Sequence, residues 1–181
     1  MLLRILLFLS RFKRATSGVT AIEFSLVAVP FFFLLYAIID ISMIFFSSTM
    51  LENGVASAAR QIRTGKVQST NMTPEQFRTL VCNEISLLLA CDARLAIDVR
   101  KYAGFSDAAF EPVLDGNGNL TGQMNFDPGT AGDVVIVRAF YTWSMLTPSI
   151  APMFTNMSGN KRLIEASTAF RNEPFGSILA N

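Results

Sequence analysis

A long apolar segment near the amino terminus constrains this chain more than any other feature. The segment from Phe24 to Phe46 spans 23 residues (46 − 24 + 1) and contains no Lys or Arg. As a helix it would rise about 35 Å, which exceeds the roughly 30 Å hydrocarbon core of a bilayer. A buried core helix of a soluble protein is the alternative, but the segment is too long for that interpretation. The sequence therefore predicts one membrane-spanning helix.

The charges before this segment indicate its orientation. No acid precedes Glu23, whereas the leader carries Arg4, Arg11, Lys13 and Arg14. Because basic residues stay on the cytoplasmic side, we expect a single-pass protein of the inner (cytoplasmic) membrane, with its N-terminus in the cytoplasm and the chain beyond about Ser47 outside. The competing interpretation is a cleavable secretory signal. Its apolar region would be only about 7–15 residues long, and Ser47-Ser48-Thr49 is a poor small-x-small site.

Gly18 and Glu23 lie where the basic leader meets the apolar segment. A carboxylate at the edge of a spanning helix is costly and usually functional, and a glycine lets the chain enter a protease cleft in an extended form. The pattern suggests a precursor cut between Gly18 and Val19, which leaves Glu23 as the fifth residue of the new N-terminus. Cleavage would free a mostly protonated α-amino group, with which Glu23 of a neighbouring subunit would pair. The alternative is an interfacial carboxylate that faces lipid headgroups.

These residues resemble a known family. The spacing Gly18-x-x-x-x-Glu23-Phe24 before a spanning helix is similar to the prepilin-peptidase site of type IV-like pilins. The wider pattern resembles the TadE-like minor pseudopilins of the tight-adherence (Tad, or Flp) pilus system. It comprises Gly18 to Val27, Pro30, Ala58-Ala59-Arg60 and Gly65, and more loosely the C-terminal stretch from Thr168 to Phe175.

The resemblance implies a function and a set of partners. A separate membrane protease, the prepilin peptidase, would remove the leader after Gly18, and Glu23 and Phe24 would serve recognition and assembly. The other partners would be pilins or pseudopilins, the inner-membrane pilus assembly platform and the lipid bilayer. The protein would act in the assembly or priming of an adhesive pilus, and its bulky exported domain indicates a minor component.

Two residues inside the apolar segment are unusual. Pro30 removes one backbone hydrogen bond and clashes with the carbonyl four residues earlier, so we expect a kink or local melting of the helix. Asp40 would meet a partner charge inside a helix bundle, or would lie near the outer headgroups if the helix is shifted. Both interpretations of Asp40 stay open.

The remaining pattern predicts an α+β fold in which a long N-terminal helix is laid against a small antiparallel sheet with a covering helix. Apolar residues continue at helical spacing past the membrane and stop before Gly65: Met50, Leu51, Val55, Ala58, Ala59 and Ile62. We therefore divide the chain into a cleaved leader (1–18), a transmembrane and extended helix (19–65) and an extracytoplasmic domain (66–181).

Within that domain, residues 66–71 are predicted to form a linker. Thr73-Pro74-Glu75-Gln76 has the pattern of a helix start. Strands are predicted at 95–102, with Leu95, Ile97 and Val99 on one face and Asp98 and Arg100 on the other, and at 133–143 and 162–170. Residues 148–160 are expected to form a loop.

The two cysteines, Cys82 and Cys91, would lie outside the cytoplasm, where a disulfide is permitted. A continuous helix would separate them by about 13 Å, beyond the roughly 7 Å limit on Cα separation. If they are bonded, the helix must therefore end near Leu89 and the chain must turn back. The alternative is two buried free thiols.

An enzymatic function finds little support in the composition. The chain contains no histidine, the commonest general base and metal ligand, and no nucleophile elbow or phosphate loop, so we expect neither catalysis nor a cofactor or metal. The stretch from Asp115 to Asn119 resembles the opening of a calcium loop, but Leu120 and Phe126 replace its glycine and glutamate, which favours a hairpin turn. A net charge of +1 does not indicate nucleic-acid binding.

Two function classes remain. The first is a structural and assembly protein, the pseudopilin described above. The alternative is an uncleaved, membrane-anchored extracytoplasmic binding or sensor module, which would keep its leader.

Overall fold

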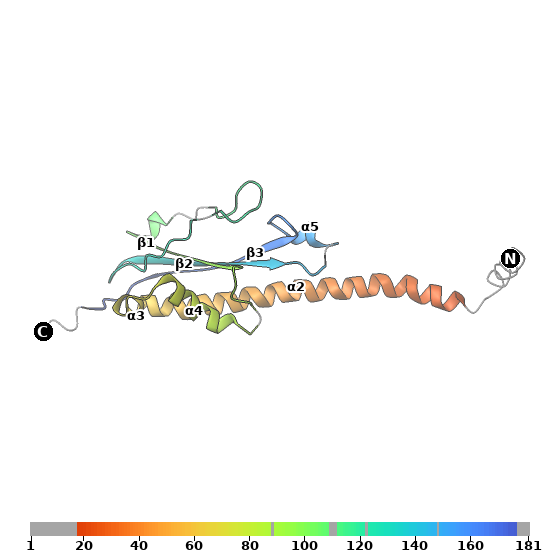
Figure 1. Ribbon diagram of the computed structural model, residues 1–181, viewed down its shortest axis with the longest axis horizontal. Coiled ribbons are helices and arrows are strands. Elements are labelled where there is room, and N and C mark those ends of the chain that lie inside the picture. The colour runs from red at the N-terminus through yellow and green to blue at the C-terminus, as the bar shows by residue number, and fades with distance from the viewer. Residues whose placement is uncertain (1–17, 88, 109–111, 122, 148, 177–181) are drawn as a thin grey trace, which may run out of the picture. The chain divides into compact units, whose positions relative to one another are not determined.

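We describe the protein from a computed structural model, which covers residues 18–87, 89–108, 112–121, 123–147 and 149–176. The fold is α+β, as expected: a long N-terminal helix is followed by short helices and a three-stranded antiparallel sheet (Figure 1). Two units divide within the long helix. The first ends at Ile39, and the second begins at Asp40 and contains the sheet.

The long helix, α2, runs from Val19 to Arg63. It continues unbroken through Pro30, so the helix does not melt there and a bend at Pro30 stays a prediction. The helix ends where Gly65 adopts a left-handed backbone with φ 78°, a conformation that glycine accepts most easily. The predicted stop at Gly65 is thus confirmed.

Within the second unit, α2 buries one stripe of side chains. The stripe has the predicted helical spacing and comprises Leu51, Val55, Ala58, Ala59 and Ile62, while Met50 is only half-buried. Gly54 extends this stripe, because a Cβ atom there would lie 2.7 Å from Cγ2 of Ile85. A glycine at this position therefore lets α4 approach the long helix closely.

Two short helices follow α2. The linker predicted at 66–71 is instead mostly helix α3 (Lys66–Ser69), because Val67 is buried and anchors the segment. Helix α4 (Pro74–Ile85) begins as predicted with a capping box: the Thr73 side chain accepts a hydrogen bond from the Gln76 amide, and the Gln76 side chain accepts one from the Thr73 amide.

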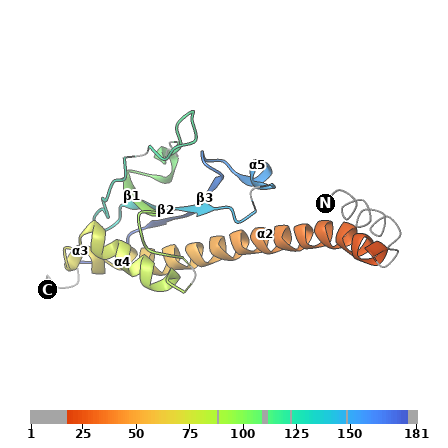
Figure 2. The same cartoon turned by 45° about the vertical axis from the view of Figure 1, so that its right-hand side comes forward.

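The sheet has the order β1-β2-β3, with all neighbours antiparallel. The strands are β1 (Leu95–Tyr102), β2 (Val134–Ser144) and β3 (Lys161–Arg171), close to the predicted ranges. Residues 134–141 of the central strand are buried without alternation. Figures 1 and 2 show why: the part of α2 from Asp40 onward and α4 lie below the sheet, and the 3-10 helix η2 (Phe105–Asp107) lies above it.

One residue of the polar face predicted for β1 is buried. Asp98 pairs with Arg100 of the same face and accepts a hydrogen bond of 2.8 Å from the Asn125 amide, which compensates the burial of its carboxylate. The segment around Phe126 runs parallel to β1 and hydrogen-bonds its Val99, which covers this edge of the sheet.

Two of the predicted connections can be compared with the structure. Residues 148–160 are not a simple loop, because they contain the short helix α5 (Ala151–Phe154). The hairpin turn at Asp115 is confirmed: Leu114 and Leu120 form an antiparallel bridge, and the Asp115 carboxylate accepts the amides of Asn117 and Asn119.

Candidate functional site

The segment Gly18–Phe24 is the candidate site, and all of it lies in the first unit. Val19 is the first residue of α2 and Glu23 is its fifth, one full turn into the helix. All of these side chains are exposed. Among the residues that the structure describes, Glu23 has no hydrogen-bond or ion-pair partner. This carboxylate is therefore available to a partner outside the described fold.

Gly18 has no structural reason to be glycine within the described chain. A Cβ atom placed on it would meet nothing within 4 Å. Its φ angle is not among the positive values that other glycines of this chain adopt. Within the described residues, neither a side-chain contact nor a positive φ angle accounts for a glycine at this position.

The helix that follows this site is apolar and exposed. From Val19 to Ile39 it rises about 32 Å, close to the thickness of a hydrocarbon core. In the most apolar stretch of 18 residues only 6% is buried, which contradicts a core helix of a soluble protein. One helix of the described chain is thus long and apolar enough to span a membrane, in agreement with a single-pass membrane protein.

Asp40 has a role that neither interpretation of the sequence foresaw. Its side chain is 0% exposed, and Oδ2 accepts hydrogen bonds from the backbone amides of Leu146 and Thr147, at 3.0 and 2.9 Å. No described group donates to Oδ1. Within the described chain, the partners of Asp40 are therefore backbone amides, and its position relative to a bundle or to the headgroups stays a prediction. The carboxylate fastens the segment after β2 to α2.

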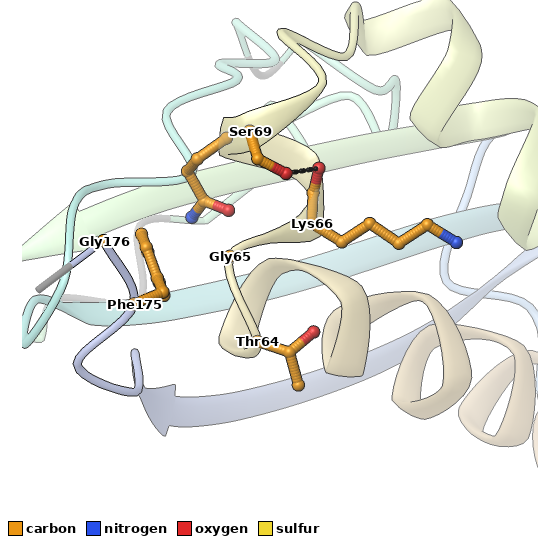
Figure 3. Close-up of a pocket in the computed structure, with 7 residues that line it drawn as sticks. Thr64, Gly65, Lys66, Ser69, Phe175 and Gly176 are labelled. Atoms are coloured by element: carbon orange, nitrogen blue, oxygen red, sulfur yellow. Dashed lines mark hydrogen bonds between the residues drawn. The ribbon is translucent and has the colours of Figure 1, made fainter. Parts of the chain in front are cut away.

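A second group of contacts lies at the C-terminal end of α2. The Glu173 amide donates to the Arg63 carbonyl at 2.9 Å, and the two side chains form an exposed ion pair at 3.4 Å. Phe175 lies against Gly65, so that a Cβ atom at Gly65 would overlap the ring (Figure 3). The cavity beside them is lined by Thr64, Gly65, Lys66, Gln68, Ser69, Phe175 and Gly176. The Ser69 hydroxyl donates to the backbone carbonyl of Lys66 and not to its amine, so we assign this cavity no chemistry.

Cys82 and Cys91 form the expected disulfide, with Cα atoms 5.7 Å apart. The bond is possible because α4 ends at Ile85, somewhat earlier than the predicted Leu89, and the chain then turns back. The disulfide lies in the second unit, so the predicted site residues do not form one cluster. No group of three or more potential metal ligands occurs in the described ranges.

The sequence interpretation missed the functions of Asp40 and of the C-terminal segment. A lone acid in an apolar helix indicated that Asp40 has a specific role. Its partners are backbone amides, however, and no residue pattern identifies them. Asn172 was overlooked in the same way. It is buried, and its side-chain amide donates to the carbonyls of Pro128 and Thr130 at 2.9 Å each.

Comparison with known proteins agrees with the geometry of the first helix. No curated protein and no solved structure matches the chain significantly. Residues 18–60, from the unexplained glycine to the last turns of α2, match the family model described as TadE-like protein, which confirms the resemblance over this part of the chain and connects it with the Tad pilus system.

Proposed function

We propose that this protein is a minor pseudopilin of a Tad pilus, matured by a prepilin peptidase that cuts between Gly18 and Val19. The observation that carries the proposal is the unexplained Gly18, followed after five residues by a carboxylate with no partner in the described chain. The family match begins at the same glycine. A protease substrate accounts for both features. The glycine would let the chain enter the protease cleft, and the carboxylate would act in assembly after cleavage.

Glu23 is the residue that we assign to assembly. After cleavage, the Val19 amino group carries a positive charge at neutral pH. Glu23 of a neighbouring subunit would pair with it. In the low dielectric of packed membrane helices, an unpaired charge is strongly disfavoured, so this pairing would fix the register of adjacent subunits.

The basic leader supports an orientation with the N-terminus in the cytoplasm and the sheet domain outside. In this orientation the helix can leave the bilayer into a pilus, with other pilins and the inner-membrane assembly platform as partners. The disulfide between Cys82 and Cys91 agrees with an oxidising compartment. We propose a structural function without catalysis, since the chain has no histidine.

Three variants test this proposal in cells that carry the pilus system and its peptidase. Gly18→Leu should block leader removal, because the side chain would obstruct the cleft. Glu23→Ala should be processed normally but should fail to co-purify with the other pilins. Ser25→Ala is the matched control, because the Ser25 hydroxyl bonds only to the Ile22 carbonyl of its own helix. Normal assembly of Glu23→Ala would refute the role of Glu23, and processing of Gly18→Leu would refute the cleavage site.

A further inference from the structure

Two exposed apolar side chains follow the end of β2. Leu146 is 68% exposed and Met153, in α5, is 81% exposed, while Ile150 and Ala151, between them in sequence, are buried in the domain. The surrounding stretch is uncharged, because no Asp, Glu, Lys or Arg occurs from Met145 to Asn160. Single exposed apolar side chains are common on protein surfaces, so the position of these two along the long helix decides what they contact.

Asp40 fixes the level of this segment along the long helix. Its two hydrogen bonds hold the Leu146 and Thr147 amides against the first residue of the second unit. Asp40 follows the exposed apolar stretch that begins at Val19, and the rise from Val19 to Asp40 is about 32 Å. The hydrocarbon core of a bilayer is about 30 Å thick. If the helix spans from Val19, it therefore leaves the hydrocarbon near Asp40.

The exposed apolar surface of α2 does not stop at Asp40. Met43, Phe45 and Phe46 are all exposed, and the next charged residue of the helix is Glu52. From Val19 to Phe46 the helix rises about 41 Å, which matches the roughly 40–45 Å of a bilayer with its headgroup zones. The stretch that follows Asp40 thus has the length and polarity expected for the outer headgroup zone, and the Leu146 and Thr147 amides are bonded to its start.

We propose that residues 146–147 and 149–153 form a membrane foot, which inserts Leu146 and Met153 into the outer lipid interface beside the helix. The proposal rests on the helix spanning the bilayer, as proposed above. Asp40 would then have two functions: it fastens the foot, and its own carboxylate is shielded from lipid by that foot. The foot would hold the sheet domain at a defined height on the membrane before the subunit is extracted into a pilus.

The experiment uses the full chain in vesicles of phosphatidylethanolamine and phosphatidylglycerol. A nitroxide is attached to a single added cysteine in Leu146→Cys or Met153→Cys, and mass spectrometry verifies that the native disulfide is intact. Collisions with oxygen, which concentrates in lipid, are compared with collisions with a water-soluble nickel chelate. Val29→Cys reports the middle of the span. Phe105→Cys is the matched control, because this exposed phenylalanine follows the end of β1 that pairs with Val134, at the far end of β2.

The proposal predicts that the labels at 146 and 153 show an oxygen-to-nickel collision ratio several-fold above that at 105 and below that at 29. If the ratios at 146 and 153 equal the ratio at 105 while the label at 29 is in lipid, the foot is refuted and the membrane span stands. If both reagents are excluded from 146 and 153, another protein copy covers the surface, which also refutes a lipid contact. If the label at 29 is reached by nickel, the span itself fails and the foot fails with it.

Discussion

The hydrogen bonds of Asp40 make the sharpest stability prediction. In Asp40→Ala the amides of Leu146 and Thr147 lose their common acceptor. In Asp40→Asn a side-chain oxygen remains to accept both, but without the negative charge. The two variants therefore separate the loss of an acceptor from the loss of a charge. Glu52→Ala is the control, because Glu52 is an exposed acid of the same helix that bonds only weakly to Ser48, at 3.5 Å.

The expected loss of stability follows from the two hydrogen bonds that Asp40 accepts. Leaving a buried donor without a partner costs about 1–3 kcal/mol, so two amides give about 2–6 kcal/mol. The lower end applies here, because the exposed Leu146 lets water reach the opened segment and because removal of a buried carboxylate relieves its desolvation. We expect about 2–3 kcal/mol for Asp40→Ala and about 1 kcal/mol for Asp40→Asn, since bonds to neutral acceptors are weaker.

Amide hydrogen exchange of the full chain in detergent micelles measures this effect locally. A loss of 2 kcal/mol corresponds to roughly 30-fold faster exchange, and the Leu146 and Thr147 amides should show it in Asp40→Ala. The Val99 amide of edge strand β1, which donates to the Asn125 carbonyl at 2.8 Å, should be unchanged. Equal exchange at 146 and 147 in wild type and Asp40→Ala would refute the idea that this carboxylate fastens the segment.

Three further predictions concern the second unit. Gly54→Val should destabilise the domain by about 1–3 kcal/mol in thermal unfolding, because the new side chain collides with Ile85. Cys82→Ser should cost about 2.7 kcal/mol, the chain-entropy value for a closed ten-residue loop, in denaturant titration. The amide of Asn119 lowers the pKa of the Asp115 carboxyl below 3.8. The ionised Asp115 carboxylate therefore stabilises the hairpin at pH values above the pKa it has in the unfolded chain. This stabilisation is lost as the pH falls through the lower pKa of the folded chain. An NMR titration of the Asn119 amide should accordingly show a midpoint below 3.8, and a midpoint above it would contradict the assignment.

The sequence predicted the fold well where periodicity and end signals act locally. The long helix, its stop at Gly65, the capping box at Thr73 and the three strands all follow from side-chain spacing and backbone preferences. The short helices were missed because they are too short to show a helical periodicity of apolar residues. Among the described residues of α3, for example, only Val67 is buried. The burial of Asp98 was not foreseen, because the groups that compensate it are a nearby Arg and a backbone amide of a distant segment.

The residues of the candidate site come from the local sequence, and their roles stay predictions. Gly18 and Glu23 stand at a fixed spacing at the start of an apolar helix, a pattern that residue identity alone displays. The function of Asp40 depends on amides more than a hundred positions away in the chain. Every residue except proline has a backbone amide, so the sequence does not show which amides donate to Asp40. Only the structure reveals them.

The most direct test of the account is N-terminal mass spectrometry of the protein purified from membranes, in cells with and without the prepilin peptidase. The account predicts a mature chain that begins at Val19 in the presence of the peptidase and an intact leader in its absence. An intact leader in both strains would contradict it, and would favour a permanently anchored binding or sensor module.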